Sequence, residues 1–367
     1  MKVFWLFNHP APYKVDFFNI LGQSCEITAV FERAREKGRN ASFYKEKPEH
    51  FNQIICSSLP LGGVNNWTRK PVGILRKEHF DIVVLNGWFT FTEQHTIAYC
   101  KKKKIPYIFY INGGIIPAQE AKWKYALKRR NISGAYCYLC PDENSKQYLI
   151  HYGAEEKRIF IYPYSSIHES SIVEHLDTYA KRKRIREAKG YDHPHLFVSC
   201  GQFIPRKNYE SLISLWAKLP EEYGLLIIGE GPLKEQYETL IASLNLQDRV
   251  HLSDYLPHET LLETFRFCDG FVFSSKEDIY GHVINEALSQ GLPVVSSKNV
   301  NAAKHLIEDG KNGFLVDIEN EEEYLSAITS IHEDMRSLAV ATAKKNTMEG
   351  AASFHLRFFE ALLGGQQ

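Results

Sequence analysis

The sequence of 367 residues has few long hydrophobic runs. No apolar segment approaches the roughly 18 residues that a helix needs to cross a bilayer. The N-terminal segment MKVFWLF has only five consecutive apolar residues, at positions 3–7, which is too short for the core of a signal peptide. We therefore expect a cytoplasmic protein that contacts the inner face of the cell membrane at most peripherally.

The sequence also lacks the cysteine patterns that bind metal. Its seven cysteines are an odd number and are scattered along the chain, which indicates a reducing compartment. Cys137 and Cys140 form a C-x-x-C, but the surrounding AYCYLC is typical of a buried strand, and no second pair accompanies it. We therefore expect both thiols to lie in the core and no metal site to form there.

Net charge is absent as well, since 44 basic residues balance 44 acidic ones, but the two signs are unevenly distributed. Residues 1–190 carry 30 basic and 18 acidic residues, and the remainder carries 14 and 26. Basic residues cluster at 101–104, 122–130 and 181–186. The amphipathic spacing of KWKYALKRR suits an anionic membrane surface, although a solvated helix face fits each cluster equally well. No helix-turn-helix, zinc-finger or RNA-binding pattern occurs, so we expect no nucleic-acid partner.

The length suits about two domains, and apolar strands alternate with helix-like segments twice along the chain. The expected strands are 3–7, 27–31, 82–85, 105–111 and 136–139, then 196–200, 224–228, 271–273, 293–296 and 313–316. Continuous apolar strands joined by helices indicate an α/β fold with parallel sheets buried on both faces. We predict two Rossmann-like domains, 1–165 and 195–367, which face each other across a cleft and are joined by the polar linker 166–194. The C-terminal helix could pack back on the first domain.

The most informative segment is SSKEDIYGHVINEALSQGLPVVSS, at residues 274–297. Asp278 and Glu286 lie eight positions apart around Gly281, which is expected to open a helix shortly after a strand. The unpaired N–H groups and the dipole of such a helix N-terminus suit a phosphate. Glu286 is expected about one and a half turns inside the helix, so that the two acids reach opposite ends of a bound phosphate ester. An ordinary strand-turn-helix unit with two solvated acids is the alternative interpretation.

A second loop, GQFIPRKN at residues 201–208, places Arg206 and Lys207 between a strand and a helix, where two cations can neutralise a diphosphate without a metal. The two loops resemble the Glu-x7-Glu and G-R-x-x-x-x-K motifs of the retaining glycosyltransferases with the GT-B fold. That family includes many bacterial capsule, O-antigen and lipid-linked sugar transferases. Asp278 stands where the family usually has Glu, and Gln202 where it has Arg, so Arg206 is expected to supply the missing charge.

The resemblance implies roles for these residues. Lys207 and Arg206 would stabilise the leaving diphosphate, while Asp278 would contact the donor sugar near the reacting centre, and these three form the expected catalytic set. Glu286 would hold the ribose hydroxyls of the donor. The turn GEGP lacks the third glycine of a dinucleotide fingerprint and would line the nucleotide pocket instead. The other expected donor-binding residues are Gly201, Gln202, Gly229, Tyr255, Leu256, Gly281, His282 and Val283.

The acceptor is expected to bind the first domain, in the loops that end its strands. The loop HPAPYK is stiffened by two prolines and resembles that of a capsule-type subgroup, which also shares FDIVVLNGW, YINGG and IYPYSS. His9 is interpreted as a hydrogen-bonded loop residue, and no general base is assigned. The expected acceptor-binding residues are Pro12, Tyr13, Lys14, Asn112 and Gly113.

The resemblance thus implies a hexosyltransferase-type enzyme of bacterial cell-surface polysaccharide synthesis. It would move a sugar, with a UDP-sugar favoured as donor, to a hydroxyl of a glycan or lipid-linked acceptor and retain the anomeric configuration. Asp-x-Asp is absent from the chain, which disfavours a metal-chelating GT-A enzyme, so we expect neither a metal nor another cofactor. Two alternatives stay open. A GT-B nucleotide-sugar epimerase would share the fold and the ligand, and a non-catalytic glycan-binding or partner subunit would fit the departures at Gln202 and Asp278.

Overall fold

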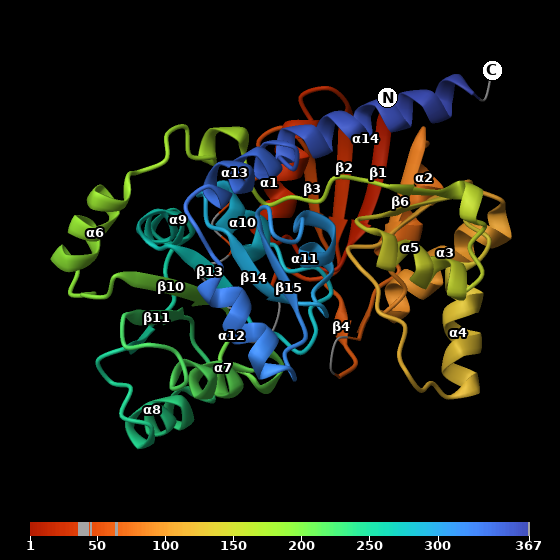
Figure 1. Cartoon of the computed structure of the whole chain (residues 1–367). Helices are drawn as coiled ribbons and strands as arrows, with labels where there is room; N and C mark the ends of the chain where they lie inside the picture. Colours follow the sequence, from red (N-terminus) through yellow and green to blue (C-terminus); the bar gives the residue numbers. More distant parts are fainter. Residues whose placement is uncertain (36–43, 45, 63–64, 366–367) are drawn as a thin grey trace. The chain divides into compact units, whose positions relative to one another are not determined.

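The computed structural model describes residues 1–35, 44, 46–62 and 65–365. The chain divides into two compact units, unit 1 (Met1–Ser165 and Met348–Gln367) and unit 2 (Ser166–Thr347). Each unit is built on a parallel sheet with helices alongside (Figure 1). The prediction of an α/β fold with two Rossmann-like domains is therefore confirmed.

Unit 1 contains a seven-stranded sheet with the order β3-β2-β1-β6-β7-β8-β9, and all of its paired neighbours run parallel. The short strands β4 and β5 form a separate antiparallel pair. The strands are β1 (Lys2–Phe7), β2 (Glu26–Phe31), β3 (Asn52–Ile55), β4 (Leu59–Pro60), β5 (Asn66–Trp67), β6 (Ile82–Asn86), β7 (Ile108–Tyr110), β8 (Cys137–Cys140) and β9 (Ile159–Ile161). The helices are α1 (Pro12–Leu21), α2 (Lys70–Lys77), α3 (Phe91–Lys103), α4 (Lys122–Ile132), α5 (Glu143–His151) and α14 (Met348–Gly364).

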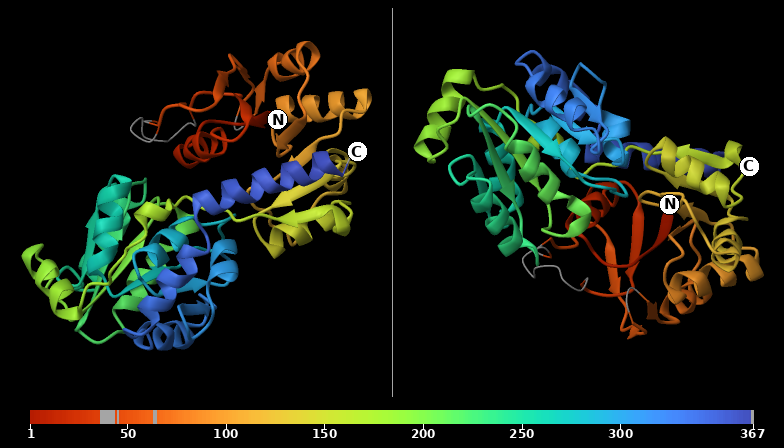
Figure 2. Two further views of the ribbon diagram at one scale, coloured as in Figure 1. Left: turned by 90° about the horizontal axis from the view of Figure 1, so that it is seen from above. Right: turned by 60° about the horizontal axis from the view of Figure 1, so that its bottom comes forward.

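The C-terminal helix α14 belongs to unit 1, although unit 2 separates it from the rest of that unit in the sequence. It packs against α1, and it is the blue helix that leads to the C-terminus in Figure 2. Its buried His355 and Phe359 lie against the ring of Trp5, which is itself fully buried in β1. Burial of such large aromatic side chains contributes strongly to the stability of a core. The last helix therefore completes the aromatic core of unit 1.

Unit 2 contains a six-stranded parallel sheet with the order β12-β11-β10-β13-β14-β15. Its strands are β10 (His195–Cys200), β11 (Tyr223–Ile228), β12 (Val250–Ser253), β13 (Gly270–Phe273), β14 (Val294–Ser297) and β15 (Gly313–Val316). Its helices are α6 (Tyr179–Ala188), α7 (Tyr209–Trp216), α8 (Lys234–Ser243), α9 (His258–Phe267), α10 (Val283–Ser289), α11 (Asn301–Leu306), α12 (Glu321–Thr329) and α13 (Met335–Lys344).

Both faces of the unit 2 sheet are covered, which explains its unbroken apolar strands. Side chains of α7, α8 and α12 share one core with alternate residues of the strands, such as Phe197 and Val272. The intervening residues Val198 and Phe271 point to the opposite face and are also fully buried. Figure 1 shows α7 and α8 on one side of these strands, and α9 and α13 on the other.

The strand order gives each sheet a topological switch point, and ligands usually bind at such points in open α/β sheets. In unit 2 this point lies between β10 and β13, because the chain moves outward from β10 in one direction and from β13 in the other. In unit 1 it lies between β1 and β6. The segments that follow β1, β10 and β13, up to the first turn of the next helix, carry most of the site residues expected from the sequence.

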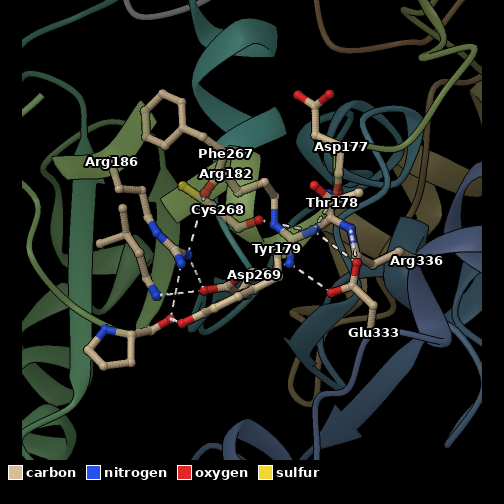
Figure 3. Close-up of polar contacts among 12 residues, drawn as sticks. Asp177, Thr178, Tyr179, Arg182, Arg186, Phe267, Cys268, Asp269, Glu333 and Arg336 are labelled. Carbon is tan, nitrogen blue, oxygen red and sulfur yellow. Dashed lines mark hydrogen bonds and ion pairs between the residues drawn. The ribbon is translucent and has the colours of Figure 1, made fainter. Parts of the chain in front are cut away.

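The predicted linker 166–194 lies in unit 2 and contains α6, whose basic sequence was interpreted as a surface cluster. That interpretation is wrong for Arg182 and Arg186, which are 1% and 0% exposed. Figure 3 shows both guanidinium groups directed at Asp269, which accepts from each of them. Arg182 also forms a bidentate ion pair with Glu333, with N–O distances of 2.9 and 2.7 Å. The cations are buried because acids distant in the sequence pair with them.

Candidate functional site

The loops after β10 and β13 bring three charged side chains together at the switch point of unit 2. Lys207 donates from Nζ to Oδ2 of Asp278 over 2.7 Å, and Arg206 donates from Nη1 to the same oxygen over 3.1 Å. Arg206 and Lys207 lie in a short 3-10 turn, Pro205–Lys207, that directly precedes α7. The structure thus joins the two cations with the first acid of the 274–297 segment, 71 and 72 positions away along the chain. We call these three residues the charge triplet.

Two serines hold the turn that carries the cations. The hydroxyl of Ser274 donates to the carbonyl oxygens of Lys207 and Asn208, at 3.0 and 3.2 Å. The hydroxyl of Ser275 lies 3.2 Å from the carbonyl oxygen of Arg206 and 2.8 Å from that of Glu277, so it links both loops. Because both serine side chains are buried, their hydrogen bonds fix the backbone of the charge triplet.

Burial and charge act against each other in the triplet. Burial lowers the pKa of Lys207 below its ordinary value, and the neighbouring Asp278 carboxylate limits this effect. For Asp278, burial acts to raise the pKa, but the charges and hydrogen bonds of Lys207 and Arg206 outweigh burial and hold the pKa below its ordinary value. The carboxylate is therefore ionised at neutral pH and serves as counterion to both cations.

The second acid, Glu286, lies closer to the helix start than the sequence indicated. Helix α10 begins at Val283 rather than at Gly281, so Glu286 falls in its first turn and not one and a half turns inside. Gly281 adopts φ 97°, a left-handed conformation that favours glycine, and a Cβ there would lie 2.9 Å from Cγ1 of Val300. The turn before α10 is thus specific for glycine.

Two neighbours that the sequence analysis missed contact Glu286. Ser166 donates from its hydroxyl to Oε1 of Glu286 over 2.9 Å. Nε2 of His258, at the start of α9, lies 3.7 Å from the same oxygen. Ser166 belongs to the IYPYSS segment, which was noted as a resemblance but given no role. The contact could not be read from the sequence, because 120 positions separate Ser166 from Glu286.

The other expected donor residues of unit 2 lie in loops at the same edge of the sheet. The turn at Gly229 packs directly on Gly201, since a Cβ on Gly229 would lie only 1.9 Å from the Gly201 carbonyl oxygen. Gln202 is exposed beside them. Tyr255 is 43% exposed and Leu256 is half-buried, in the loop after β12. His282 and Val283 are half-buried at the start of α10. Their roles in donor binding stay predictions.

The expected acceptor residues of unit 1 lie at the ends of β1 and β7. Pro12, Tyr13 and Lys14 form the first turn of α1 rather than a loop. Lys14 is only 5% exposed, and its Nζ donates to Oδ1 of Asn8 over 3.0 Å and lies 4.4 Å from the centre of the Phe7 ring. Two further expected residues, Asn112 and Gly113, follow β7 and are half-buried. His9, also buried, is hydrogen-bonded to Tyr44 as interpreted, with 3.3 Å between its Nδ1 and the hydroxyl.

The sequence analysis also missed a pair of buried acids in unit 1. Thr90 donates from its hydroxyl to Oε1 of Glu32 over 2.7 Å, and its backbone N–H donates to Oε2 of Glu93 over 3.0 Å. Burial raises the pKa of Glu32 to about 7 and that of Glu93 to about 8, and the Glu32 charge adds to the effect on Glu93. The T-F-T-E sequence at 90–93 is a capping-box pattern that could have revealed Glu93.

Within residues 1–35, 44, 46–62 and 65–365, no group of three or more His, Cys, Asp and Glu side chains is arranged to hold a metal ion. Cys137 and Cys140 are both buried in β8, as predicted. Over the same part of the chain, none of the helices combines the length and the apolar character needed to traverse a bilayer.

Comparison with known proteins relates the fold and the loops to one group of enzymes. Residues 181–347 match the family model described as Glycosyl transferases group 1. The lipopolysaccharide core biosynthesis glycosyltransferase LpsE of Rhizobium meliloti is 33% identical over 137 residues, which cover 37% of this chain and 39% of that protein. An N-acetylgalactosaminyltransferase of Campylobacter jejuni that acts on a diphospho-undecaprenol-linked sugar is 31% identical over 139 residues, or 37% of each chain. The chain thus spans about two fifths of the length of these curated relatives.

Solved structures extend the likeness of the fold to the whole chain. The Anabaena protein HepE, solved with UDP, aligns with a TM-score of 0.74 and 16% sequence identity over 98% of this chain and 100% of its own. HepE has also been solved with UDP-glucose. The chain therefore has the GT-B fold, and the sequence of its unit 2 is similar to that of the group 1 glycosyltransferases.

Proposed function

We propose that this chain is a glycosyltransferase that moves a sugar from a nucleoside diphosphate to a hydroxyl of a glycan or lipid-linked acceptor. The observation that carries the proposal is the charge triplet at the switch point of unit 2. It gathers Lys207 and Arg206 where the loops of two strands diverge, and it leaves them with a single carboxylate as counterion. Two cations at such a point suit the diphosphate of a sugar nucleotide.

In the proposed reaction, the bond between the anomeric carbon of the sugar and the diphosphate oxygen breaks, and both of its electrons leave on the diphosphate. The hydroxyl oxygen of the acceptor forms the new bond to that carbon, and its proton passes to the departing diphosphate. Lys207 and Arg206 stabilise the charge that develops on the leaving diphosphate, an interaction that strengthens in the transition state. The start of α10 contributes its helix dipole, while the N–H groups of Ile284 and Glu286 donate to the carbonyl oxygens of Gly281 and His282, each over 3.1 Å. Retention of the anomeric configuration is part of the proposal.

Glu286 is proposed to bind the ribose of the donor. Its side chain is held by Ser166 and His258 at Oε1, so Oε2 can accept hydrogen bonds from vicinal hydroxyls. A UDP-sugar is the favoured donor, and the binding of UDP and UDP-glucose by HepE, a protein of the same fold, supports this choice. The name of LpsE supports a role in the synthesis of cell-surface polysaccharide, and the name of the Campylobacter transferase supports a lipid-linked acceptor.

The basic residues of unit 1 are proposed to contact an anionic membrane that carries the acceptor. Lys101 in α3 donates from Nζ to the carbonyl oxygens of Arg130 and Ser133, so the end of α3 lies beside the end of α4. Two of the three basic clusters therefore adjoin each other. We define the α3-α4 basic surface as the exposed residues Lys102, Lys103, Lys104, Lys122, Trp123, Lys124, Arg129 and Arg130.

The test is incubation of the purified chain with a panel of nucleotide sugars, with and without lipid extract, and with EDTA in a parallel series. We expect release of the nucleoside diphosphate that depends on an acceptor and persists in EDTA. Conversion of the donor without an acceptor would instead indicate an epimerase. Glycan binding with no turnover of any donor would indicate a non-catalytic subunit, and a strict requirement for Mg²⁺ or Mn²⁺ would contradict a phosphate site made of cations alone.

A further inference from the structure

One carboxylate oxygen accepts hydrogen bonds from both of the cations that are proposed to bind the diphosphate. Oδ2 of Asp278 accepts from Nζ of Lys207 at 2.7 Å and from Nη1 of Arg206 at 3.1 Å. The side chains of Lys207 and Asp278 are only 11% and 15% exposed, so water screens their contact weakly. A carboxylate oxygen and a phosphate oxygen are equivalent partners for an ammonium or a guanidinium group, since both are charged hydrogen-bond acceptors.

The backbone around Asp278 is anchored on both sides. Its N–H donates to the carbonyl oxygen of Asn299 over 3.2 Å, and its own carbonyl oxygen accepts from the N–H of Asn301 over 3.4 Å. Residues 278 and 300 thus form an isolated parallel bridge. When the Asp278 carboxylate moves, we therefore expect the side chain to rotate about its own bonds while the loop stays in place.

We propose that Asp278 is an internal counterion that a bound diphosphate must displace from Lys207 and Arg206. This inference rests on the proposed function for the identity of the phosphate site and adds a regulation of that same site. In the absence of ligand, Asp278 neutralises one of two positive charges, the buried Lys207 and the more exposed Arg206, and stabilises the loops. When the diphosphate of a sugar nucleotide binds, its oxygens replace Oδ2 on both cations, and the released carboxylate becomes available to the donor sugar.

Displacement makes the site selective for ligands of high negative charge. A ligand must provide stronger contacts to the two cations than the covalently held carboxylate, whose effective concentration is high. A diphosphate has several oxygens and more than one negative charge, whereas a monophosphate has fewer of each. Asp278 thereby lowers the affinity for every phosphate ligand, and a diphosphate, which engages both cations, competes with the carboxylate better than a monophosphate does.

The experiment is calorimetric titration of UDP and of inorganic pyrophosphate into the wild-type chain and into Asp278→Asn. Since the variant removes the competing charge, we expect both probes to bind about tenfold more tightly, the effect of one charge-assisted hydrogen bond. Glu277→Gln is the matched control, because it removes the same charge from the adjacent residue, whose side chain is exposed and which Arg206 contacts only through its main-chain oxygen at 2.8 Å. The control should bind both probes as the wild type does.

Unchanged or weaker binding of both probes by Asp278→Asn would overturn the inference while leaving the proposed function intact. If neither probe binds to any of the three proteins, the proposed phosphate site itself is wrong, and the inference fails with it. A crystal structure of the wild-type chain with UDP gives a second measurement that needs no variant. There, Oδ2 of Asp278 should lie beyond hydrogen-bond distance of Nζ of Lys207, and a contact that persists beside the bound diphosphate would overturn the inference.

Discussion

Lys207 has two properties that suit it to stabilise a leaving diphosphate. It is buried, and its partner Asp278 can be displaced by the ligand. Burial makes its charge effective, because the interaction of a cation with a phosphate is stronger where water is excluded. Asp278 keeps that charge in place, since burial alone lowers the pKa of Lys207. The neighbouring Arg206 is more exposed, and its guanidinium also donates to the main-chain oxygen of Glu277. The larger share of transition-state stabilisation is therefore expected from Lys207.

We predict that Lys207→Ala removes most of the donor turnover. The loss of one charged contact to the leaving group should raise the barrier by about 2–4 kcal/mol, which corresponds to a decrease in kcat of about 30-fold to 1,000-fold. The change is measured by initial rates of UDP release with saturating donor.

Lys276→Ala is the matched control, because Lys276 lies in the adjoining loop and is exposed. It should retain the rate of the wild type. Circular dichroism and thermal unfolding establish whether Lys207→Ala remains folded. A folded Lys207→Ala with nearly full turnover would show that the diphosphate binds elsewhere.

Helix α3 begins over a buried acid pair, and this element couples the stability of unit 1 to pH. Glu93 caps the helix through the backbone N–H of Thr90, while Glu32 accepts from the hydroxyl of the same threonine. Burial favours the protonated form of both acids, and the charges of Arg33 and Lys14 only partly oppose it. The folded chain thus retains protons that the unfolded chain releases near the ordinary pKa of glutamic acid.

We predict that Glu32 and Glu93 make the chain less stable as the pH rises from about 5 to 8, because both carboxyls keep their protons to higher pH in the folded than in the unfolded state. Buried His355, whose pKa burial lowers to about 4, acts in the opposite direction, so the contribution of the acids is measured as the difference between wild type and variant. Glu32→Gln should reduce this decline by about 1–3 kcal/mol, since a neutral amide can still accept from Thr90. Urea unfolding at pH 5 and pH 8 measures the difference. Glu49→Gln removes an exposed acid and should show the decline of the wild type. An identical decline in Glu32→Gln would mean that Glu32 is ionised in the folded chain.

Helix α6 is attached to the rest of unit 2 by its buried arginines. Arg186 donates to the carboxylate of Asp269 and, from Nη2, to the carbonyl oxygen of Pro194 over 3.1 Å. We predict that Arg186→Met lowers the free energy of unfolding by about 3 kcal/mol, because it leaves part of the Asp269 charge uncompensated in a buried position. Denaturant titration of the variant measures the loss. Lys183→Met, on the exposed side of the same helix, should change stability by less than about 1 kcal/mol.

For the molecule as a whole, the sequence predicts the fold well, because continuous apolar strands such as 196–200 and 224–228 have a local signature. Other elements have weaker signatures. Strand β3 (Asn52–Ile55) has two polar residues followed by two apolar ones, which is neither an alternating pattern nor a continuous apolar run, and α11 (Asn301–Leu306) is a six-residue helix. Such short elements depend on tertiary packing rather than on their own periodicity.

The candidate site was predictable in its residues but not in its contacts. The motif spacing identified Lys207, Asp278 and Glu286, yet no local pattern indicates that Asp278 pairs with Lys207 across 71 positions. The same limit explains the error at α6, where the sequence shows basic residues but not the distant acid Asp269. Pairing between remote side chains is set by the fold, and it decides which charges remain available to a ligand.

The uneven distribution of charge along the chain determines which unit is expected to bind a membrane. Because α6 buries two of its arginines, membrane attraction is expected from unit 1 and its α3-α4 basic surface. There, Trp123 is 65% exposed beside Lys122 and Lys124, an arrangement of an aromatic ring and cations that suits the interface of an anionic bilayer. Each lysine near such a surface contributes about 1 kcal/mol to binding. The attraction falls off over a Debye length, which is about 10 Å in 0.1 M salt.

We predict that the chain sediments with vesicles that contain phosphatidylglycerol and remains in solution with vesicles of phosphatidylcholine alone. The double variant Lys122→Glu/Lys124→Glu should weaken binding at least about 30-fold, since it removes two attractive charges of about 1 kcal/mol each and adds repulsion. Trp123→Ala should weaken it further at high salt, where the apolar contact is the larger contribution. Lys183→Glu is the control, because it reverses the charge of an exposed lysine in the α6 cluster. Equal loss in this control would indicate a response to net charge rather than to the α3-α4 basic surface, and binding to both kinds of vesicle would exclude recognition of the anionic headgroup.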